Sequence, residues 1–257
     1  DGADLPMFSL AALSCVAFAV LHIAADRALP RIDYAAMVHK DRAQQVSLAQ
    51  SCVTLLTAPL QGVLYFMAAL SSGGNTEDRL FSSSPTHTLG MQINLGVTLY
   101  ETGLYLTYGK PAEFWAHHLL GIFVLTTGTV SGHFHQTFAW AGVAEITGLN
   151  LALLDLMKTF GLSGTAFVVN GALLWLGFLT TRVISMAICW SFLASDLLAM
   201  HAAGRWTSLC PGLREVVLPA LIFIWGLSTF WFTKIHRGLI KAVRGSGSAG
   251  EVARKSE

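Results

Sequence analysis

Charged residues are scarce in this sequence. Asp, Glu, Lys and Arg together make up 12% of its 257 residues, whereas soluble domains average about 25%. Apolar side chains account for 53% of the chain, and the mean hydropathy is +0.56. The composition therefore predicts an integral membrane protein. The formal net charge of only +1 also argues against a nucleic-acid partner.

The sequence also has few cysteine or histidine patterns that are typical of metal sites. No CxxC or other ligand spacing connects the cysteines, which are Cys15, Cys52, Cys189 and Cys210. The histidines form one adjacent pair, His117 and His118, and one HxH pattern, His133 and His135, in a predicted turn. Membrane di-iron enzymes use several HxxxH and HxxHH clusters, so we expect no metal site. A retinal-type lysine is also lacking, because Lys234 lies at the end of the last apolar run, where it is predicted to be an interfacial anchor.

The sequence does have long apolar runs. A helix needs about 20 apolar residues to cross a bilayer, and seven runs have about this length. Because the runs are continuous and not alternating, they predict helices rather than the strands of a barrel. The predicted spans cover residues 6–25, 46–70, 89–108, 114–130, 137–158, 165–193 and 216–235.

Polar segments divide the chain. We expect residues 1–37 to form a first transmembrane helix and a polar connector, and residues 38–243 to form the main domain. Residues 244–257 are rich in Gly, Ser and charge, and predict a disordered tail. Segments 71–88 and 196–214 are predicted loops. The expected fold is all-α, with about seven transmembrane helices, six of which build the main bundle.

The adjacent histidines His117 and His118 lie near the start of the fourth run. Ionisable groups inside apolar runs are unfavourable and indicate a polar site inside a helix bundle. Neighbours on a helix point about 100° apart, so only one of the two is expected to face squarely inward. A neutral imidazole can act as base, acid or nucleophile. The alternative is a structural histidine bonded to a neighbouring helix.

Carboxylates and an arginine accompany the pair. Glu145 lies in the middle of the fifth run and Asp155 near its end, while Glu101 and Arg182 lie inside other runs. An ionised carboxylate in this setting needs a partner. An ion pair between Arg182 and a carboxylate is therefore the structural alternative to a functional role for these residues.

Six segments, in order, resemble the TRAM–LAG1–CLN8 (TLC) domain family of membrane proteins. They are DRAQQVSLAQS, LGVTLYETGLYL, AHHLLGI, AEITGLNLALLDLMKTFG, NGALLWLGFLTTRVI and WFTKIHRGLIK, and together they fall within residues 38–243. The family often has His where Gln50 stands here, and usually has Asp where Glu101 stands. The fifth segment supplies the family's arginine as Arg182.

The resemblance implies a bundle of membrane helices around a polar-lined cavity for lipid. In ceramide synthases, which belong to this family, the histidine pair carries acyl-CoA-dependent N-acylation. On this interpretation the catalytic residues are His117, His118, Glu145 and Asp155, and the ligand contacts are Glu101, Asn150, Lys158 and Arg182. The synthases carry two aspartates in the helix that here holds Glu145, and the second falls near Gly148. The sequence is therefore closer to the non-synthase TLC-domain proteins.

Three functions remain as alternatives. The first is a protein that binds lipid or acyl chains and influences membrane lipid composition or sphingolipid metabolism. The second is an acyl-CoA-dependent N-acyltransferase, with acyl-CoA as substrate and no tightly bound cofactor. The third is a structural subunit of a larger membrane complex. The expected partners are membrane lipids, and a homo-oligomer or a membrane-complex partner is the alternative to a monomer. The endoplasmic reticulum membrane is the family default, with another organellar membrane as the alternative.

The distribution of Lys and Arg predicts the orientation. With seven spans, one side of the membrane receives twelve of these residues and the other receives three. Cytoplasmic loops carry the excess of positive charge, so a reporter fused after Glu257 should be accessible from the cytosol in intact cells. A reporter before Asp1 should be protected. The reverse accessibility would overturn this orientation and move the histidine pair to the opposite half of the membrane.

Overall fold

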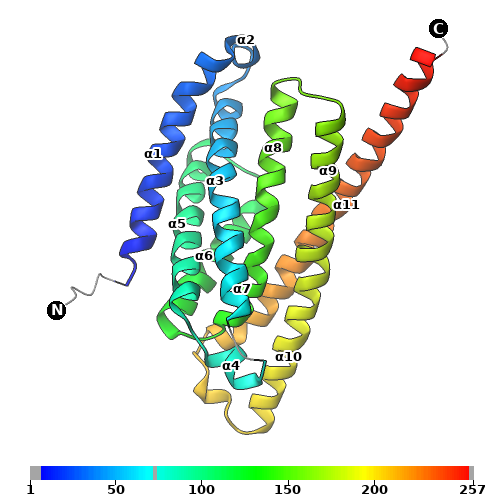
Figure 1. Ribbon diagram of the computed structural model, residues 1–257. Helices are drawn as coiled ribbons and strands as arrows, with labels where there is room; N and C mark the ends of the chain where they lie inside the picture. The colour runs from blue at the N-terminus through cyan, green and yellow to red at the C-terminus, as the bar shows by residue number, and fades with distance from the viewer. Residues whose placement is uncertain (1–6, 72–73, 255–257) are drawn as a thin grey trace.

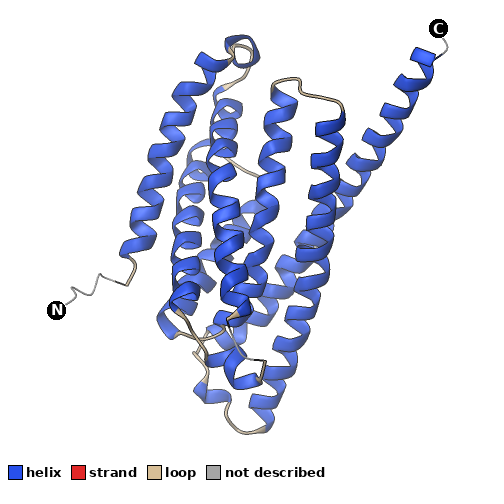
Figure 2. Cartoon of the chain, in the orientation of Figure 1, coloured by secondary structure: helices blue, strands red, loops and turns tan. Residues whose placement is uncertain are grey.

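The computed structural model describes residues 7–71 and 74–254 (Figure 1). All regular secondary structure in these residues is helical (Figure 2), which confirms the predicted fold class. Long helical segments run alongside one another as a bundle. They are α1 (Ser9–Ile32), α3 (Arg42–Leu70), α5 (Pro85–Tyr108), α6 (Ala112–Ser131), α7 (His135–Gly142) with η1 (Val143–Ile146) and α8 (Thr147–Thr159), α9 (Thr165–Gly177) with η2 (Phe178–Ser185) and α10 (Met186–Ala202), and α11 (Leu213–Arg254).

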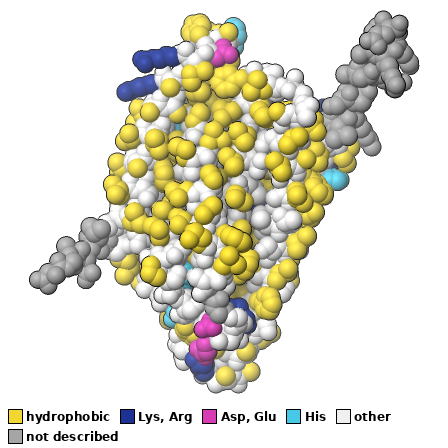
Figure 3. Space-filling model, viewed as in Figure 1, with side chains coloured by type: hydrophobic (Ala, Val, Ile, Leu, Met, Phe, Trp, Pro, Cys, Tyr) yellow, Lys and Arg dark blue, Asp and Glu magenta, His cyan; other side chains and the backbone are white. Residues whose placement is uncertain are grey.

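Five of these segments are long and apolar enough to cross a membrane: those spanning Ser9–Ile32, Arg42–Leu70, His135–Thr159, Thr165–Ala202 and Leu213–Lys241. Helices α5 and α6 contain 24 and 20 residues, so they are about 36 and 30 Å long and match a hydrocarbon core of about 30 Å. Their hydropathy is lowered by polar residues such as Glu101 and the histidine pair. Hydrophobic side chains cover the middle of the face seen in Figure 3, and charged side chains gather toward its two ends.

Several boundaries differ from the prediction. Short helices α2 (Tyr34–Met37) and α4 (Thr76–Phe81) and the turn η3 (Trp206–Ser208) lie in the connections. Helix α10 continues to Ala202 through the predicted start of a loop, because Asp196 is buried there and pairs with Arg79 of α4 at 2.6 Å. Helix α11 is described through Arg254, beyond the predicted end of the last span at residue 235. Extension of an existing helix lacks the unfavourable nucleation step.

The helix ends follow from local sequence. Asp41 accepts a hydrogen bond from the backbone N–H of Gln44, whose side chain accepts one from the N–H of Asp41, and this capping box begins α3. Ser84 caps α5, which has proline as its first residue. Gly109 and Gly132 end α5 and α6 at φ of 75° and 71°, a conformation that glycine adopts readily. The short connections make α5 and α6 antiparallel neighbours.

Helix α3 packs against α1, α5, α7 and α8, and leaves one apolar face exposed. Helix α1 closes one side and approaches α5 at Gly96. A Cβ atom added to Gly96 would lie 2.6 Å from Cβ of Ser14 and 2.7 Å from the carbonyl oxygen of Ala11. The contact therefore brings the two backbones together at a distance that only glycine permits.

We predict opposite effects for the same substitution at two positions of α5. Gly96→Ala should lower the melting temperature of the purified protein, because overpacking against the α1 backbone costs about 1–3 kcal/mol. Gly103→Ala is the matched control, since a Cβ atom there meets nothing within 4 Å. The control should keep or raise the melting temperature, because alanine favours a helix over glycine by about 1 kcal/mol. Equal melting temperatures for the two variants would contradict this packing of α1 on α5.

Candidate functional site

A cavity of about 170 Å³ lies inside the bundle, lined by residues of α3, α5, α6, α7, η1, α8, α10 and α11. Its polar lining comes largely from α3 and α5. This lining includes Thr54, Thr57, Gln61, Asn94, Thr98 and Glu101. Apolar side chains of α6 and α11 line it as well, namely Leu120, Val124, Leu125, Val217, Leu221 and Ile224. The cavity is therefore amphipathic, as are the lipids that surround a membrane protein.

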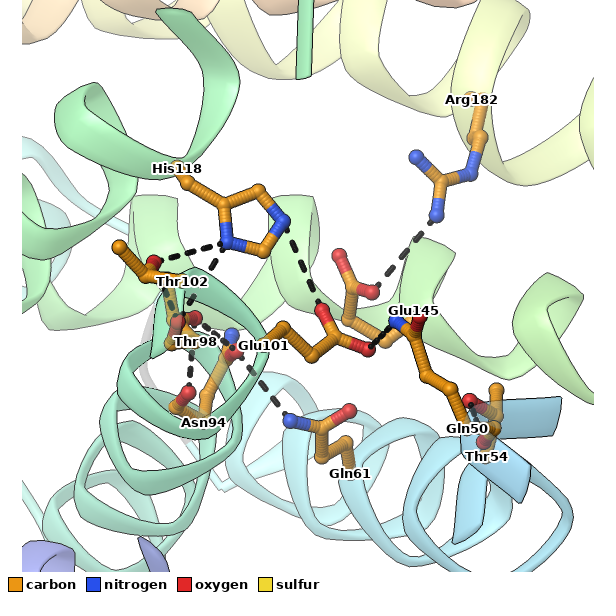
Figure 4. Close-up of polar contacts among 10 residues, drawn as sticks. All are labelled: Gln50, Thr54, Gln61, Asn94, Thr98, Glu101, Thr102, His118, Glu145 and Arg182. Atoms are coloured by element: carbon orange, nitrogen blue, oxygen red, sulfur yellow. Dashed lines mark hydrogen bonds and ion pairs between the residues drawn. The ribbon is translucent and has the colours of Figure 1, made fainter. Parts of the chain in front are cut away.

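Both histidines of the pair line this cavity, although only one was expected to face squarely inward. Their ring centroids are 5.5 Å apart and their planes are inclined by 72°. His118 is buried and points toward α5 (Figure 4). The ring of His117 lies on the α11 side, with its centroid 6.3 Å from that of Trp231. Adjacent positions on α6 thus contact two different walls of one cavity.

His118 is held by α5 through both ring nitrogens. Its Nε2 lies 3.5 Å from Oε2 of Glu101, and its Nδ1 lies 3.2 Å from Oγ1 of Thr102. The Thr102 hydroxyl donates its only hydrogen to the carbonyl oxygen of Thr98, at 2.6 Å. It therefore faces Nδ1 as an acceptor, and Nδ1 carries the hydrogen. The other carboxylate oxygen of Glu101, Oε1, accepts a hydrogen bond from Nε2 of Gln50 at 2.9 Å.

The ring of His117 has a different environment. Its Nδ1 is buried and has no hydrogen-bond partner among the described residues. Buried polar atoms in native proteins are nearly always hydrogen-bonded, and an orphan among them needs an explanation. The orphan nitrogen belongs to a residue that lines the cavity. A polar group inside the cavity would supply the missing partner.

Glu145 and Arg182 form an ion pair between two irregular helical segments. Glu145 lies on the 3₁₀ segment η1, and Arg182 lies on the π-helical segment η2. Nη2 of Arg182 lies 3.7 Å from Oε2 of Glu145, and its Nε donates a hydrogen bond of 2.9 Å to Oγ1 of Thr147. Arg182 is only 6% exposed. The expected pairing of Arg182 with a carboxylate is confirmed, and Figure 4 shows it beside the histidine and Glu101.

Four predicted site residues lie outside the cavity lining: Arg182, whose ion pair is described above, and Asn150, Asp155 and Lys158. Asp155 accepts a hydrogen bond of 2.8 Å from Ser51 of α3. Asn150 bonds Asn170 of α9 through its side chain and its backbone carbonyl. Lys158 lines a separate cavity. The carboxylate beside His118 is therefore Glu101, not Glu145 or Asp155. Asp155 follows Glu145 by ten positions, which moves it about 15 Å along the helix.

A second series of hydrogen-bonded side chains lies in the cavity, and it was not predicted from the sequence. Nε2 of Gln61 donates to Oδ1 of Asn94 at 3.2 Å, and Nδ2 of Asn94 donates to the hydroxyl of Tyr65 at 3.0 Å. The signal was present in the spacing of polar residues. Gln50, Thr54, Thr57 and Gln61 recur every three or four positions in α3, and this spacing marks one face of a helix.

We predict that Arg182→Leu lowers the melting temperature of the protein in detergent. The change leaves Glu145 inside the bundle without its cation, and an unsatisfied group of this kind costs about 1–3 kcal/mol. The double variant Arg182→Leu with Glu145→Leu should regain part of that loss, because no charge is then left alone. Wild-type stability of the single variant would show that the ion pair does not support the fold.

Comparison with known proteins identifies the family of the chain. A family model described as the TLC domain matches residues 46–237, which extend from α3 into α11 and include every residue that lines the cavity. No curated protein and no solved structure is significantly similar to the chain. Because the matched region covers most of the sequence and the whole helical bundle around the cavity, the chain belongs to the TLC-domain family of membrane proteins.

Proposed function

We propose that the protein binds the polar end of an acyl lipid in the central cavity and thereby influences membrane lipid composition. The observation that carries this proposal is the buried, partnerless Nδ1 of His117 in an amphipathic cavity. A lipid carbonyl, amide or hydroxyl group would lie between His117 and the polar lining on α3 and α5. The first part of its acyl chain would contact the apolar residues of α6 and α11.

The size of the cavity limits what it encloses. A dry cavity of about 150 Å³ holds a molecule as large as benzene, and the volume here is about 170 Å³. It therefore fits a polar group with a short stretch of chain rather than a whole lipid. The rest of the chain would extend between the helices into the bilayer. The proposed location is the membrane of the endoplasmic reticulum.

N-acyl transfer is the second candidate, and the contact between His118 and Glu101 favours it. In that reaction the amine of an acceptor lipid attacks the thioester carbon of acyl-CoA, a C–N bond forms and the C–S bond breaks. A neutral histidine takes the proton from the amine nitrogen, and the thiolate of CoA leaves and is protonated. His117 has a free nitrogen for this proton, whereas His118 is oriented by Glu101 and Thr102.

The packing at Gly148 favours binding over transfer. Gly148 stands near the position of the second synthase aspartate, as judged from the resemblance. A Cβ atom there would lie 3.0 Å from Cβ of Ala58 and 3.4 Å from Cγ2 of Thr54. A larger side chain at Gly148 would therefore require Ala58 to shift by a few tenths of an ångström. This tight packing disfavours a carboxylate side chain here, so the proposal places lipid binding first.

We predict that His117→Leu weakens lipid binding without lowering stability. Loss of one hydrogen bond of about 1–1.5 kcal/mol weakens binding about 5- to 10-fold. The melting temperature of the lipid-free protein should stay the same or rise, because His117 Nδ1 makes no internal hydrogen bond. His118→Leu should instead lower the melting temperature, since it removes the contacts with Glu101 and Thr102. His39→Leu, at an exposed position, is the control for a histidine outside the site.

The measurement uses purified protein and an N-acyl amide lipid with a diazirine on its acyl chain. Crosslinks should map to α6 and α11, and the signal should fall in His117→Leu and not in His39→Leu. The same preparations receive acyl-CoA and a long-chain amine, and product is sought by mass spectrometry. Turnover that His117→Leu abolishes would establish transfer. Crosslinking that is equal in all variants, or that maps outside these helices, would leave a structural role and overturn the proposal.

A further inference from the structure

A second cavity, of about 280 Å³, lies between α8, α9 and α11. We name it the α8–α9–α11 groove. Most of its lining is apolar, and the residues that matter here are Leu151, Leu154, Lys158, Leu174, Lys234 and Leu239. It shares no lining residue with the central cavity. A ligand in this groove would therefore not occupy the site of the proposed function.

The groove contains positive charge and no carboxylate in its lining. Among the described residues, no carboxylate lies within 4.0 Å of the amine of Lys158 or Lys234. The nearest acidic residue in sequence, Asp155, bonds Ser51 on α3 instead. The Nζ of Lys234 lies 4.2 Å above the ring of Phe230, which leaves the charge uncompensated by an anion. Both lysines thus line one apolar groove, and neither has a carboxylate counter-ion among the described residues.

Two glycines keep the groove open. A Cβ atom on Gly238 of α11 would meet nothing within 4 Å, and one on Gly171 of α9 would only touch Cδ1 of Leu239, at 3.8 Å. Both glycines line the groove. Space, apolar walls and two cations are the features that an anionic phospholipid requires. Basic pockets between transmembrane helices on the cytoplasmic side bind anionic head groups, and the Lys and Arg distribution assigns this end of α8 to that side.

We propose that the α8–α9–α11 groove binds one anionic phospholipid. Its phosphate lies between the amines of Lys158 and Lys234, and an acyl chain packs on the leucines of α8 and α9. A zwitterionic phospholipid with the same chains is a poorer ligand, because its choline or ethanolamine group brings a positive charge toward the two lysines. Selectivity for the anionic head group therefore follows from the absence of a carboxylate in the lining.

The test is a titration of delipidated protein in neutral detergent with phosphatidylglycerol or with phosphatidylcholine of identical chains, followed by thermal unfolding. A ligand that binds only the folded state raises the melting temperature. We expect phosphatidylglycerol to act at lower concentration than phosphatidylcholine. Lys158→Gln and Lys234→Gln should each weaken the apparent affinity about five-fold, and the double variant about 25-fold. Arg31→Gln with Lys40→Gln, which removes one charge from the last turn of α1 and one from the α1–α3 connection, should leave the affinity unchanged.

A filling variant separates loss of the groove from loss of the fold. Gly238→Leu adds a side chain where space is open and replaces glycine by a better helix former. The lipid-free variant should melt at or above the wild-type temperature and should lose the response to phosphatidylglycerol. Equal responses to the two lipids, an unchanged response in the double lysine variant, or a full response in Gly238→Leu would each overturn the proposal. None of these outcomes bears on crosslinking in the central cavity.

Discussion

The burial of Arg182 is the constraint on which the interior of this bundle depends. A guanidinium cannot be deprotonated in a protein, and it cannot lie among hydrocarbon groups without partners. Glu145 supplies the opposite charge and Thr147 supplies an acceptor. All three residues lie where the regular α-helix changes to, or begins after, a 3₁₀ or π segment. Such segments recur at functional sites, and here they face each other across the bundle interior.

Beside this ion pair, polar and apolar side chains of the cavity lining come largely from different helices. Helices α3 and α5 contribute amides, hydroxyls and Glu101, while α6 contributes both the histidines and apolar groups. Both ring nitrogens of His118 contact α5, so this side chain connects α6 to α5 at the cavity. His117 retains a nitrogen, Nδ1, without a partner among the described residues, and this nitrogen is the basis of the proposed ligand contact. The division of roles within one adjacent pair is a consequence of the angle of about 100° between neighbours on a helix.

The sequence was sufficient for the helical class, for the seven long helical segments and for the polar character of the interior. Apolar runs of membrane length have few alternatives, and buried ionisable groups need a protein environment. The partner of His118 was not predictable in the same way. Glu101 lies on another helix, and the contact depends on how α5 and α6 rotate against each other. Asp155 was expected beside the histidine pair but bonds Ser51. A polar residue in an apolar run indicates that the residue faces protein, but it does not indicate which helix the residue faces.

Helix α8 illustrates why residues on one segment belong to different sites. Gly148 and Asp155 are seven positions apart, lie nearly on one line and face α3. Leu151, Leu154 and Lys158 follow each other at helical spacing and line the α8–α9–α11 groove instead. With 100° per residue the two lines are separated by about a quarter of a turn. A single sequence motif thus contributes Gly148 to the central cavity and Lys158 to the α8–α9–α11 groove. A carboxylate and an amine only three residues apart consequently have different neighbours: Asp155 bonds α3, and Lys158 lines the groove for which we propose an anionic phospholipid.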